Sequence, residues 1–111
     1  MAVYEQFSDS ITDWNGLEDA KKYIWQKQLH IYEVPFYYIE YGMAQLGAVG
    51  VWRNYKQNPQ KGLEGYLNAL KLGYTVPISQ IYAAANVPFD FSKGYITELM
   101  NFVKEELTKL K

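Results

Sequence analysis

The chain has 111 residues, 49% of them hydrophobic and 21% charged, which suits one globular domain with a modest buried core. Its 11 basic and 12 acidic residues give a net charge of −1 and form no basic run, which excludes the electrostatic pattern of nucleic-acid-binding proteins. The absence of cysteine excludes disulfides and thiolate metal sites, and it is typical of a reducing cytoplasm.

Two further features bear on where the protein resides. The segment from Met1 to Ile11 is acidic and polar, whereas a secretory signal begins with basic residues and an apolar run. The longest apolar stretch, Phe36 to Trp52, contains Glu40 and Gln45 and falls short of the roughly 20 apolar residues that span a bilayer. We therefore expect a cytoplasmic protein with no nucleic-acid and no membrane partner.

The first residues are expected to be a weakly structured lead-in over positions 1–14, in which Val3 to Phe7 has the pattern of one short helix. Asn15 and Glu18 then have the spacing of a capping box. Apolar residues recur at helical intervals after this point until Pro35 forces an extended backbone. This pattern predicts a first helix from Leu17 to His30.

Pro35 suits the first position of a second helix, which is predicted to continue to Asn58. This helix is apolar on nearly all sides, so we expect it to be central, with Trp52 and Tyr55 in the core. Glycines in a helix interior cost about 1 kcal/mol each relative to alanine, and here they indicate close approach by neighbouring elements. They are Gly42, Gly47 and Gly50.

A third helix is predicted between Asn58, a good N-cap, and Gly73, a good C-terminal stop. Pro59 suits its first turn. The apolar side chains at helical spacing predict the face that it buries. They are Leu63, Tyr66, Leu67 and Leu70.

Two more helices complete the pattern. Pro77 lies just inside a short fourth helix that ends at Ala85 and Asn86, and Ser92 caps a last helix that continues to Leu110. The connector between them, Val87 to Phe91, contains a proline and is too short to build a sheet. We therefore predict an all-α fold of about five helices, a bundle forming one domain over residues 15–111.

Motifs of several enzyme classes are missing. The chain has a single His, whereas a zinc site built on an H-E-x-x-H helix needs two. The sequence contains neither a glycine-rich phosphate loop nor a G-x-S-x-G turn. We therefore expect no metal and no other cofactor in this chain.

An imidazole and several phenols gather between His30 and Tyr41, at the junction of the first two predicted helices. On the second predicted helix, Tyr38 and Tyr41 are three residues apart and share a face, as Tyr37 and Tyr41 do at four residues apart. Their hydroxyls would be aligned donors near a helix N-terminus, where backbone N–H groups favour an oxyanion or a substrate carbonyl. This junction is the candidate site.

The strings around this junction are Trp25 to His30, Val34 to Tyr41, Gln45 to Ala48 and Trp52 to Tyr55. With them, the chain from about Asp13 to Leu110 resembles the C-terminal end of oligoendopeptidase F and its relatives in the thimet oligopeptidase group of zinc metallopeptidases. Two later segments resemble the family less specifically. They are Gly65 to Tyr74 and Phe89 to Ser92.

The resemblance implies roles for three residues. In that family, zinc is held by the two His of H-E-x-x-H and a more distant Glu, all upstream of the segment that resembles this chain. By motif position, His30 would hydrogen-bond the peptide near the scissile bond, Tyr38 would brace the substrate, and Tyr41 would direct its hydroxyl at the oxyanion. His30 and Tyr41 are therefore the expected catalytic residues, and all three are expected to bind substrate.

Simpler interpretations exist for the same residues. His30 also suits a helix end, where its side chain would bond a last-turn carbonyl. Tyr37, Tyr38 and Tyr41 also suit packing in a core or an interface, and of the three Tyr37 is expected to serve packing only. Glu40 is expected to face solvent near a helix N-terminus, where its charge is favoured.

Two hypotheses about function result. The first is a C-terminal fragment of an oligoendopeptidase F-like zinc peptidase that hydrolyses short peptides, with this chain inactive alone because it lacks the metal motif. The second is a non-catalytic helical module that forms a homo-oligomer through an exposed aromatic surface. The aromatic content of 17% suits either an interface or a polar pocket.

Overall fold

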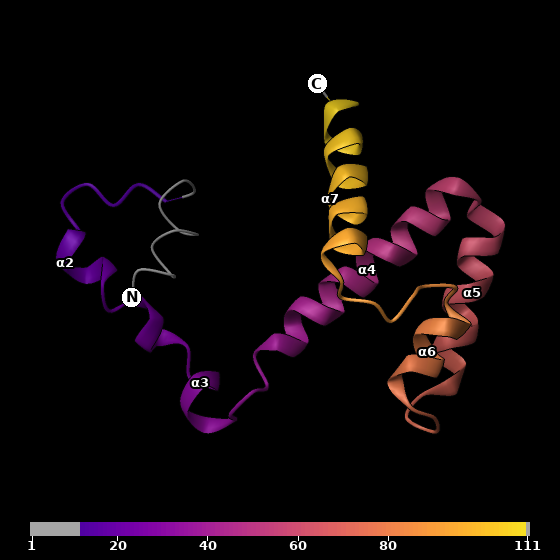
Figure 1. Cartoon of the computed structure of the whole chain (residues 1–111), viewed down its shortest axis with the longest axis horizontal. Coiled ribbons are helices and arrows are strands. Elements are labelled where there is room, and N and C mark those ends of the chain that lie inside the picture. Colours follow the sequence, from indigo (N-terminus) through magenta and orange to yellow (C-terminus); the bar gives the residue numbers. More distant parts are fainter. Residues whose placement is uncertain (1–11, 111) are drawn as a thin grey trace. The chain divides into compact units, whose positions relative to one another are not determined.

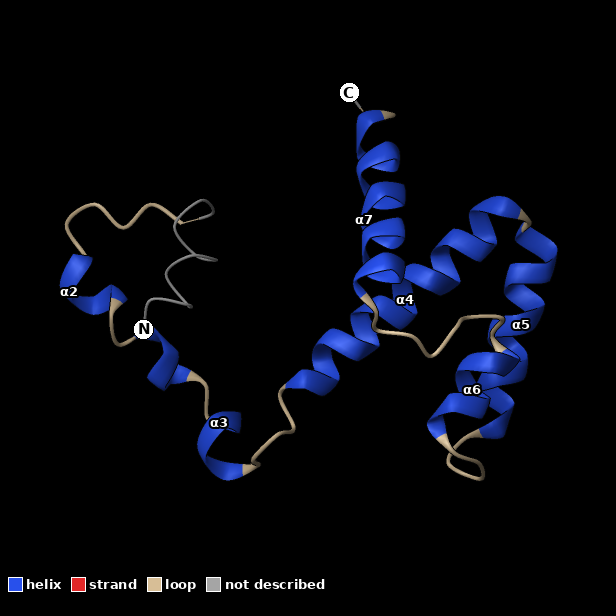
Figure 2. Cartoon of the chain, viewed as in Figure 1, coloured by secondary structure: helices blue, strands red, loops and turns tan. Residues whose placement is uncertain are grey.

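The computed structural model describes residues 12–110, and every regular element in that range is a helix (Figure 1 and Figure 2). The predicted all-α fold class is confirmed. The elements are α2 (Glu18–Lys21), the 3-10 helix η1 (Ile24–Lys27), α3 (His30–Glu33), α4 (Ile39–Gln57), α5 (Pro59–Leu72), α6 (Ile78–Ala84) and α7 (Lys93–Thr108). The helix predicted from Val3 to Phe7 lies outside the described residues. None of the described helices is both long and apolar enough to cross a membrane.

The chain divides into two compact units between Ile39 and Glu40. The first contains α2, η1 and α3, and the second contains α5, α6, α7 and all of α4 except its first residue. The predicted boundary between a lead-in over residues 1–14 and one domain over residues 15–111 stays a prediction.

The continuous first helix predicted from Leu17 to His30 is wrong, because the structure has separate single turns in its place. The capping box does not form: Leu17 precedes α2, and the Glu18 carboxylate accepts a hydrogen bond from the Gly16 backbone N–H at 3.0 Å. The middle of the segment contains consecutive aromatic and β-branched residues, which are modest helix formers. Short helices also depend on a packed apolar face, and α2, η1 and α3 contain no buried residue.

The second predicted helix starts at Ile39 instead of Pro35. The residues from Pro35 to Tyr38 form turns, in which the Tyr37 backbone N–H donates to the Val34 carbonyl at 3.1 Å. Phe36 has a φ of 66°, in the left-handed region. An L-residue in this region cannot continue a right-handed helix, so α4 begins only after this turn.

The predicted ends of α5 are confirmed. Asn58 is the N-cap, and its side chain accepts from the Lys61 backbone N–H at 3.0 Å. Pro59 is the first helical residue, and Gly73 follows the helix with a φ of 53°. The Asn58 side chain pairs with one free N–H of the first turn, and Pro59 has no N–H that would need a partner. The Gly73 N–H pairs with the Leu70 carbonyl at the other end.

The predicted buried face of α5 is wrong. Small residues face the interior of the second unit, namely Gly62, Gly65 and Ala69, whereas the large apolar residues are exposed. The helix backbone lies too close to its neighbours for larger side chains, since a Cβ at Gly62 would be 2.6 Å from the Tyr55 Cα. The exposed residues are Leu63, Tyr66, Leu67 and Leu70.

Helices α5 and α6 lie side by side in the second unit (Figure 1). A small apolar core joins them to the connector that follows. Its buried members are Ala69, Ala85 and Val87. Asn54 of α4 closes the C-terminal end of α6 by donating to the Ala85 and Asn86 carbonyls at 3.2 and 2.8 Å. Partly buried Val51, Ile81, Tyr82 and Ala84 pack around the core.

The prediction that neighbouring elements approach the glycines of α4 closely is confirmed for two of the three. A Cβ at Gly47 would lie 2.6 Å from the Tyr82 hydroxyl, and one at Gly50 would lie 2.7 Å from Val87 Cγ1. At Gly42, in contrast, a Cβ would meet nothing within 4 Å. Packing therefore requires the small residues only in the middle of α4.

The fourth and fifth helices follow the prediction closely. Pro77 is the N-cap of α6 instead of its first residue, and Asn86, with a φ of 58°, follows its end. Ser92 caps α7 by accepting from the Tyr95 backbone N–H at 3.3 Å. The connector Val87 to Phe91 is not a strand, as expected.

Polar and aromatic contacts join α4 to α7. Arg53 pairs with Glu98 at 2.6 Å, and Lys56 pairs with Glu106 at 2.7 Å. The Trp52 ring meets the Phe102 ring edge-on at 4.8 Å. Trp52 and Tyr55 are 39% and 46% exposed, so their predicted place in the core is wrong. Leu99 is the fully buried large side chain of α7.

Candidate functional site

His30 is the first residue of α3 and is half-buried. Its backbone carbonyl accepts from the Val34 N–H at 3.3 Å, which marks the end of this single helical turn. His30 therefore starts a short helix instead of ending a long one, and a bond from its side chain to a last-turn carbonyl stays a prediction.

Two aromatic rings from the following turn contact the His30 imidazole. The Tyr38 ring is tilted by 45° with its centroid 5.6 Å away. The Tyr37 ring is nearly parallel to it, with an interplanar angle of 9° and a centroid distance of 6.1 Å. Both distances lie within the usual range for aromatic pairs. The structure therefore brings together two of the three predicted site residues, His30 and Tyr38.

Tyr38 lies in the turn before α4 and is 47% exposed. The prediction that Tyr38 and Tyr41 share a helical face is wrong, because Tyr38 is not helical. The same holds for Tyr37 and Tyr41. Because Phe36 is left-handed, α4 starts only at Ile39, after Tyr37 and Tyr38.

Tyr41 lies in the first turn of α4 and is 50% exposed. It belongs to the second compact unit, whereas His30 and Tyr38 belong to the first. The neighbouring Glu40 is exposed in the first turn of α4, as expected, and its charge suits the positive end of the helix dipole.

Sequence reasoning assigned Tyr37 to packing and so missed its contact with the imidazole. Its side chain is 44% exposed. The helical pattern used for prediction paired Tyr37 with Tyr41, whereas the turn pairs it with His30. The proline at position 35 and the aromatic run after it were the available signals that a turn, instead of a helix, follows α3.

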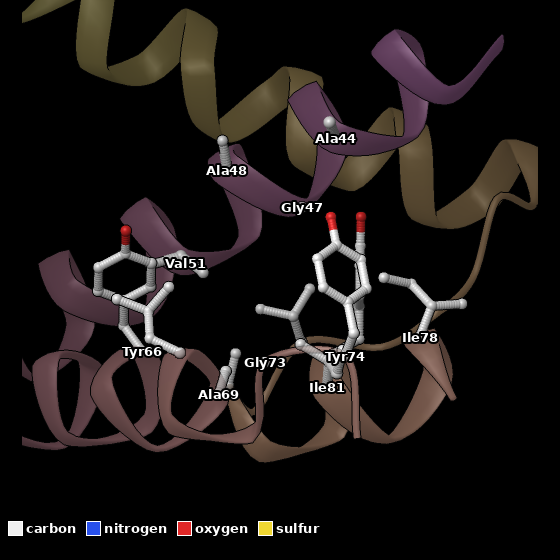
Figure 3. A pocket seen from close by; sticks show the side chains of 14 residues that line it. Ala44, Gly47, Ala48, Val51, Tyr66, Ala69, Gly73, Tyr74, Ile78 and Ile81 are labelled. Atoms are coloured by element: carbon white, nitrogen blue, oxygen red, sulfur yellow. The ribbon is translucent and has the colours of Figure 1, made fainter. Parts of the chain in front are cut away.

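A groove of about 580 Å³ lies within the second unit, between α4 on one side and α5 and α6 on the other (Figure 3). Figure 3 shows Ala44, Gly47 and Ala48 opposite Ala69, Ile78 and Ile81. None of the three predicted site residues lines it. The remaining lining residues are Val51, Tyr66, Leu70, Gly73, Tyr74, Tyr82, Ala85 and Val87.

Tyr82 is the best-anchored hydroxyl of this groove. It donates to the Met43 carbonyl at 2.9 Å and is partly buried. Burial raises the pKa of Tyr82 above its ordinary value. With its hydroxyl engaged and protonated, Tyr82 holds α6 against α4 instead of acting as an acid or base.

The residues present do not fit a zinc site. The sequence has one His and no Cys, and among residues 12–110 no three His, Cys, Asp or Glu side chains come close enough to hold a metal. Catalytic zinc needs about three protein ligands. No metal is assigned to this part of the chain.

Comparisons with curated proteins and with solved structures find no match. A family model described as Peptidase family M3 matches residues 2–101, which is most of the chain and includes His30, Tyr38 and Tyr41. The matched range contains all the motif strings, from Trp25 to Ser92, through which the chain resembles the thimet oligopeptidase group. The chain therefore belongs to peptidase family M3, a family of metallopeptidases.

Proposed function

We propose that this chain is the C-terminal segment of an oligoendopeptidase F-like zinc peptidase that hydrolyses short peptides in the cytoplasm. Its contribution is to bind the substrate and stabilise the oxyanion. The metal and the general base belong to the part of the enzyme that carries H-E-x-x-H. This chain alone is inactive, because it lacks the ligands for zinc.

The observation that carries this proposal is the ring contact between His30 and Tyr38 in a chain of family M3. The two residues are eight positions apart, and the turn after α3 brings their rings to 5.6 Å. The resemblance to the thimet oligopeptidase group implies that both bind substrate. A contact between them gives a peptide one place at which to meet an imidazole and a phenol.

The chemistry of the three side chains suits these roles. A neutral imidazole donates one hydrogen bond and accepts another, so His30 can pair with a peptide N–H or carbonyl. Tyr38 offers an apolar ring and a hydroxyl to the substrate backbone. The Tyr41 hydroxyl is a donor for the oxyanion, and such a donor stabilises charge that develops in the transition state.

The test compares two samples in hydrolysis of a fluorescence-quenched pool of randomised hexapeptides. The first is the purified chain, and the second is the chain co-expressed with a polypeptide that carries the H-E-x-x-H segment of a family M3 peptidase. The purified chain should neither hydrolyse peptides nor bind stoichiometric zinc. The co-expressed sample should do both. Hydrolysis by the purified chain alone, or no hydrolysis by the co-expressed sample, would overturn the proposal.

A second candidate function is self-association without catalysis, in which exposed apolar surface mediates a homo-oligomer. The observation that favours it is the exposure of the large apolar residues of α5, with Leu70 58% exposed beside the groove. Monomers rarely expose large contiguous apolar patches. Sedimentation velocity would show a concentration-dependent oligomer that Leu70→Glu dissociates and Glu64→Gln does not. A wild-type monomer at every concentration would exclude this candidate.

A further inference from the structure

The Tyr37 ring lies nearly parallel to the His30 imidazole, at 9° and 6.1 Å between centroids. Aromatic pairs at such distances prefer either offset-parallel or edge-to-face geometry, and this pair has the parallel form. The Tyr38 ring approaches the same imidazole at 45° and 5.6 Å. Two rings therefore flank the His30 imidazole, and one of them, that of Tyr37, has no assigned role.

The backbone explains how residues so close in sequence can meet. Helix α3 ends after Glu33, and the Tyr37 N–H closes a turn by donating to the Val34 carbonyl at 3.1 Å. Phe36 adopts a φ of 66° inside this turn, and its side chain is 96% exposed. The chain therefore reverses direction through Phe36 and returns Tyr37 to the imidazole.

Core packing does not explain Tyr37. Its side chain is 44% exposed, and every residue from Ile31 to Glu40 is exposed. A tyrosine that served only to fill a core would be mostly buried. A non-glycine residue held in the left-handed region is also uncommon, and such conformations concentrate at functional sites.

We propose that Tyr37 is a positioning residue that holds the His30 imidazole in its substrate-binding orientation by stacking on its face. This inference rests on the proposed role of His30 in binding peptide. Tyr37 acts through His30 and needs its ring but not its hydroxyl. Phenylalanine should therefore replace it, and leucine should not.

The experiment uses the whole chain and the single His of the sequence, whose imidazole proton resonances are identified without ambiguity by NMR. Wild-type, Tyr37→Phe and Tyr37→Leu are compared, with Tyr32→Leu as a matched control, since the Tyr32 ring stacks on Trp25 at 6.2 Å. The His30 resonances are recorded first without ligand and then during titration with the pool of randomised hexapeptides.

We expect Tyr37→Leu to remove the contribution of Tyr37 to the ring-current shift of the His30 proton and to weaken apparent peptide affinity about 2- to 10-fold, the range for one aromatic pair. Tyr37→Phe and Tyr32→Leu should retain both the shift and the affinity. An unmoved His30 resonance or an unchanged affinity in Tyr37→Leu would overturn the positioning role.

Failure of the proposed function would look different. In that case peptides would leave the His30 resonance of the wild-type chain unchanged, which would end the substrate-binding role of His30 and with it the role of Tyr37. The ligand-free spectrum would still report whether the two rings stack. A negative result in the peptide titration of the wild-type chain therefore counts against the proposed function. A negative result in the ligand-free comparison of wild type with Tyr37→Leu counts against the positioning role of Tyr37.

Discussion

Gly62 of α5 lies directly against the backbone of Tyr55 in α4. A Cβ atom at position 62 would be 2.6 Å from both the backbone nitrogen and the Cα of Tyr55. Backbone atoms cannot move aside as the end of a flexible side chain can. The two helices can pack as they do only because residue 62 has no side chain.

Replacing Gly62 with alanine should therefore destabilise the protein. Overpacking of this kind costs about 1 to 3 kcal/mol, and it should lower the midpoint of urea denaturation followed by circular dichroism. Gly42→Ala is the matched control, because a Cβ there meets nothing within 4 Å and alanine is favoured in a helix interior by about 1 kcal/mol. Equal stability of the two variants would show that α4 and α5 do not pack this closely.

The Tyr82 hydroxyl joins α6 to α4 through its hydrogen bond to the Met43 carbonyl at 2.9 Å. Tyr82→Phe removes this bond and keeps the ring that packs edge-on against Phe89 at 5.1 Å. We expect a loss of about 0.5 to 1.5 kcal/mol in the free energy of unfolding. Tyr74→Phe, at a fully exposed tyrosine, should leave stability unchanged. A Tyr82→Phe variant as stable as wild type would contradict the assigned hydrogen bond.

Glu106 should make the stability of the protein depend on acid pH. Hydrogen bonds from Lys109 and then Lys56 hold the pKa of this carboxyl below its ordinary value. A lowered folded-state pKa adds stability at pH values above the pKa of the unfolded chain, and this stability is lost as pH falls through the folded-state pKa.

The measurement is the free energy of unfolding as a function of pH for wild type, Glu106→Gln and the exposed control Glu64→Gln. Glu106→Gln should be less stable than wild type at neutral pH, and the difference should shrink on acidification. Glu64→Gln should follow wild type throughout. A constant difference between Glu106→Gln and wild type at all pH values would rule out the ion-pair explanation.

The left-handed turn at Phe36 should control the geometry around His30. Glycine adopts a positive φ readily, so Phe36→Gly should keep the His30 proton resonance in its wild-type position. Valine is strongly disfavoured there, because its branched Cβ clashes in the left-handed region. Phe36→Val should therefore shift or broaden the resonance. Identical spectra for the two variants would show that the turn does not set the imidazole environment.

The sequence predicted those parts of the fold that local chemistry determines. Asn58 and Pro59 start α5, Gly73 ends it, and Ser92 caps α7, because each of these residues satisfies or avoids an unpaired backbone group by itself. The glycines at 47 and 50 also indicated close packing correctly. These signals need no knowledge of distant residues.

The parts that depend on distant partners were predicted less well. Helical periodicity showed which residues of α5 are apolar but not which face meets α4, and small residues occupy that face instead of Leu63 and Leu67. The first predicted helix is broken into short pieces, and no residue of these pieces is buried to stabilise a longer helix. At the candidate site, motif position indicated His30 and Tyr38. The turn at Phe36, which has a positive φ, brings Tyr37 to His30. Helical periodicity carries no signal for such a turn.

We propose that this chain supplies an oxyanion donor, Tyr41, and a substrate-binding imidazole, His30, to a zinc peptidase. The most direct test is kcat/KM for the randomised hexapeptides in the chain co-expressed with the H-E-x-x-H segment, measured for wild type, Tyr41→Phe and Tyr55→Phe. Tyr41 and Tyr55 both lie on α4 and are 50% and 46% exposed. Tyr41→Phe removes one oxyanion donor and should lower kcat, and with it kcat/KM, about 100- to 1,000-fold. Tyr55→Phe should have the kcat/KM of wild type. Equal rates for Tyr41→Phe and Tyr55→Phe would contradict the account.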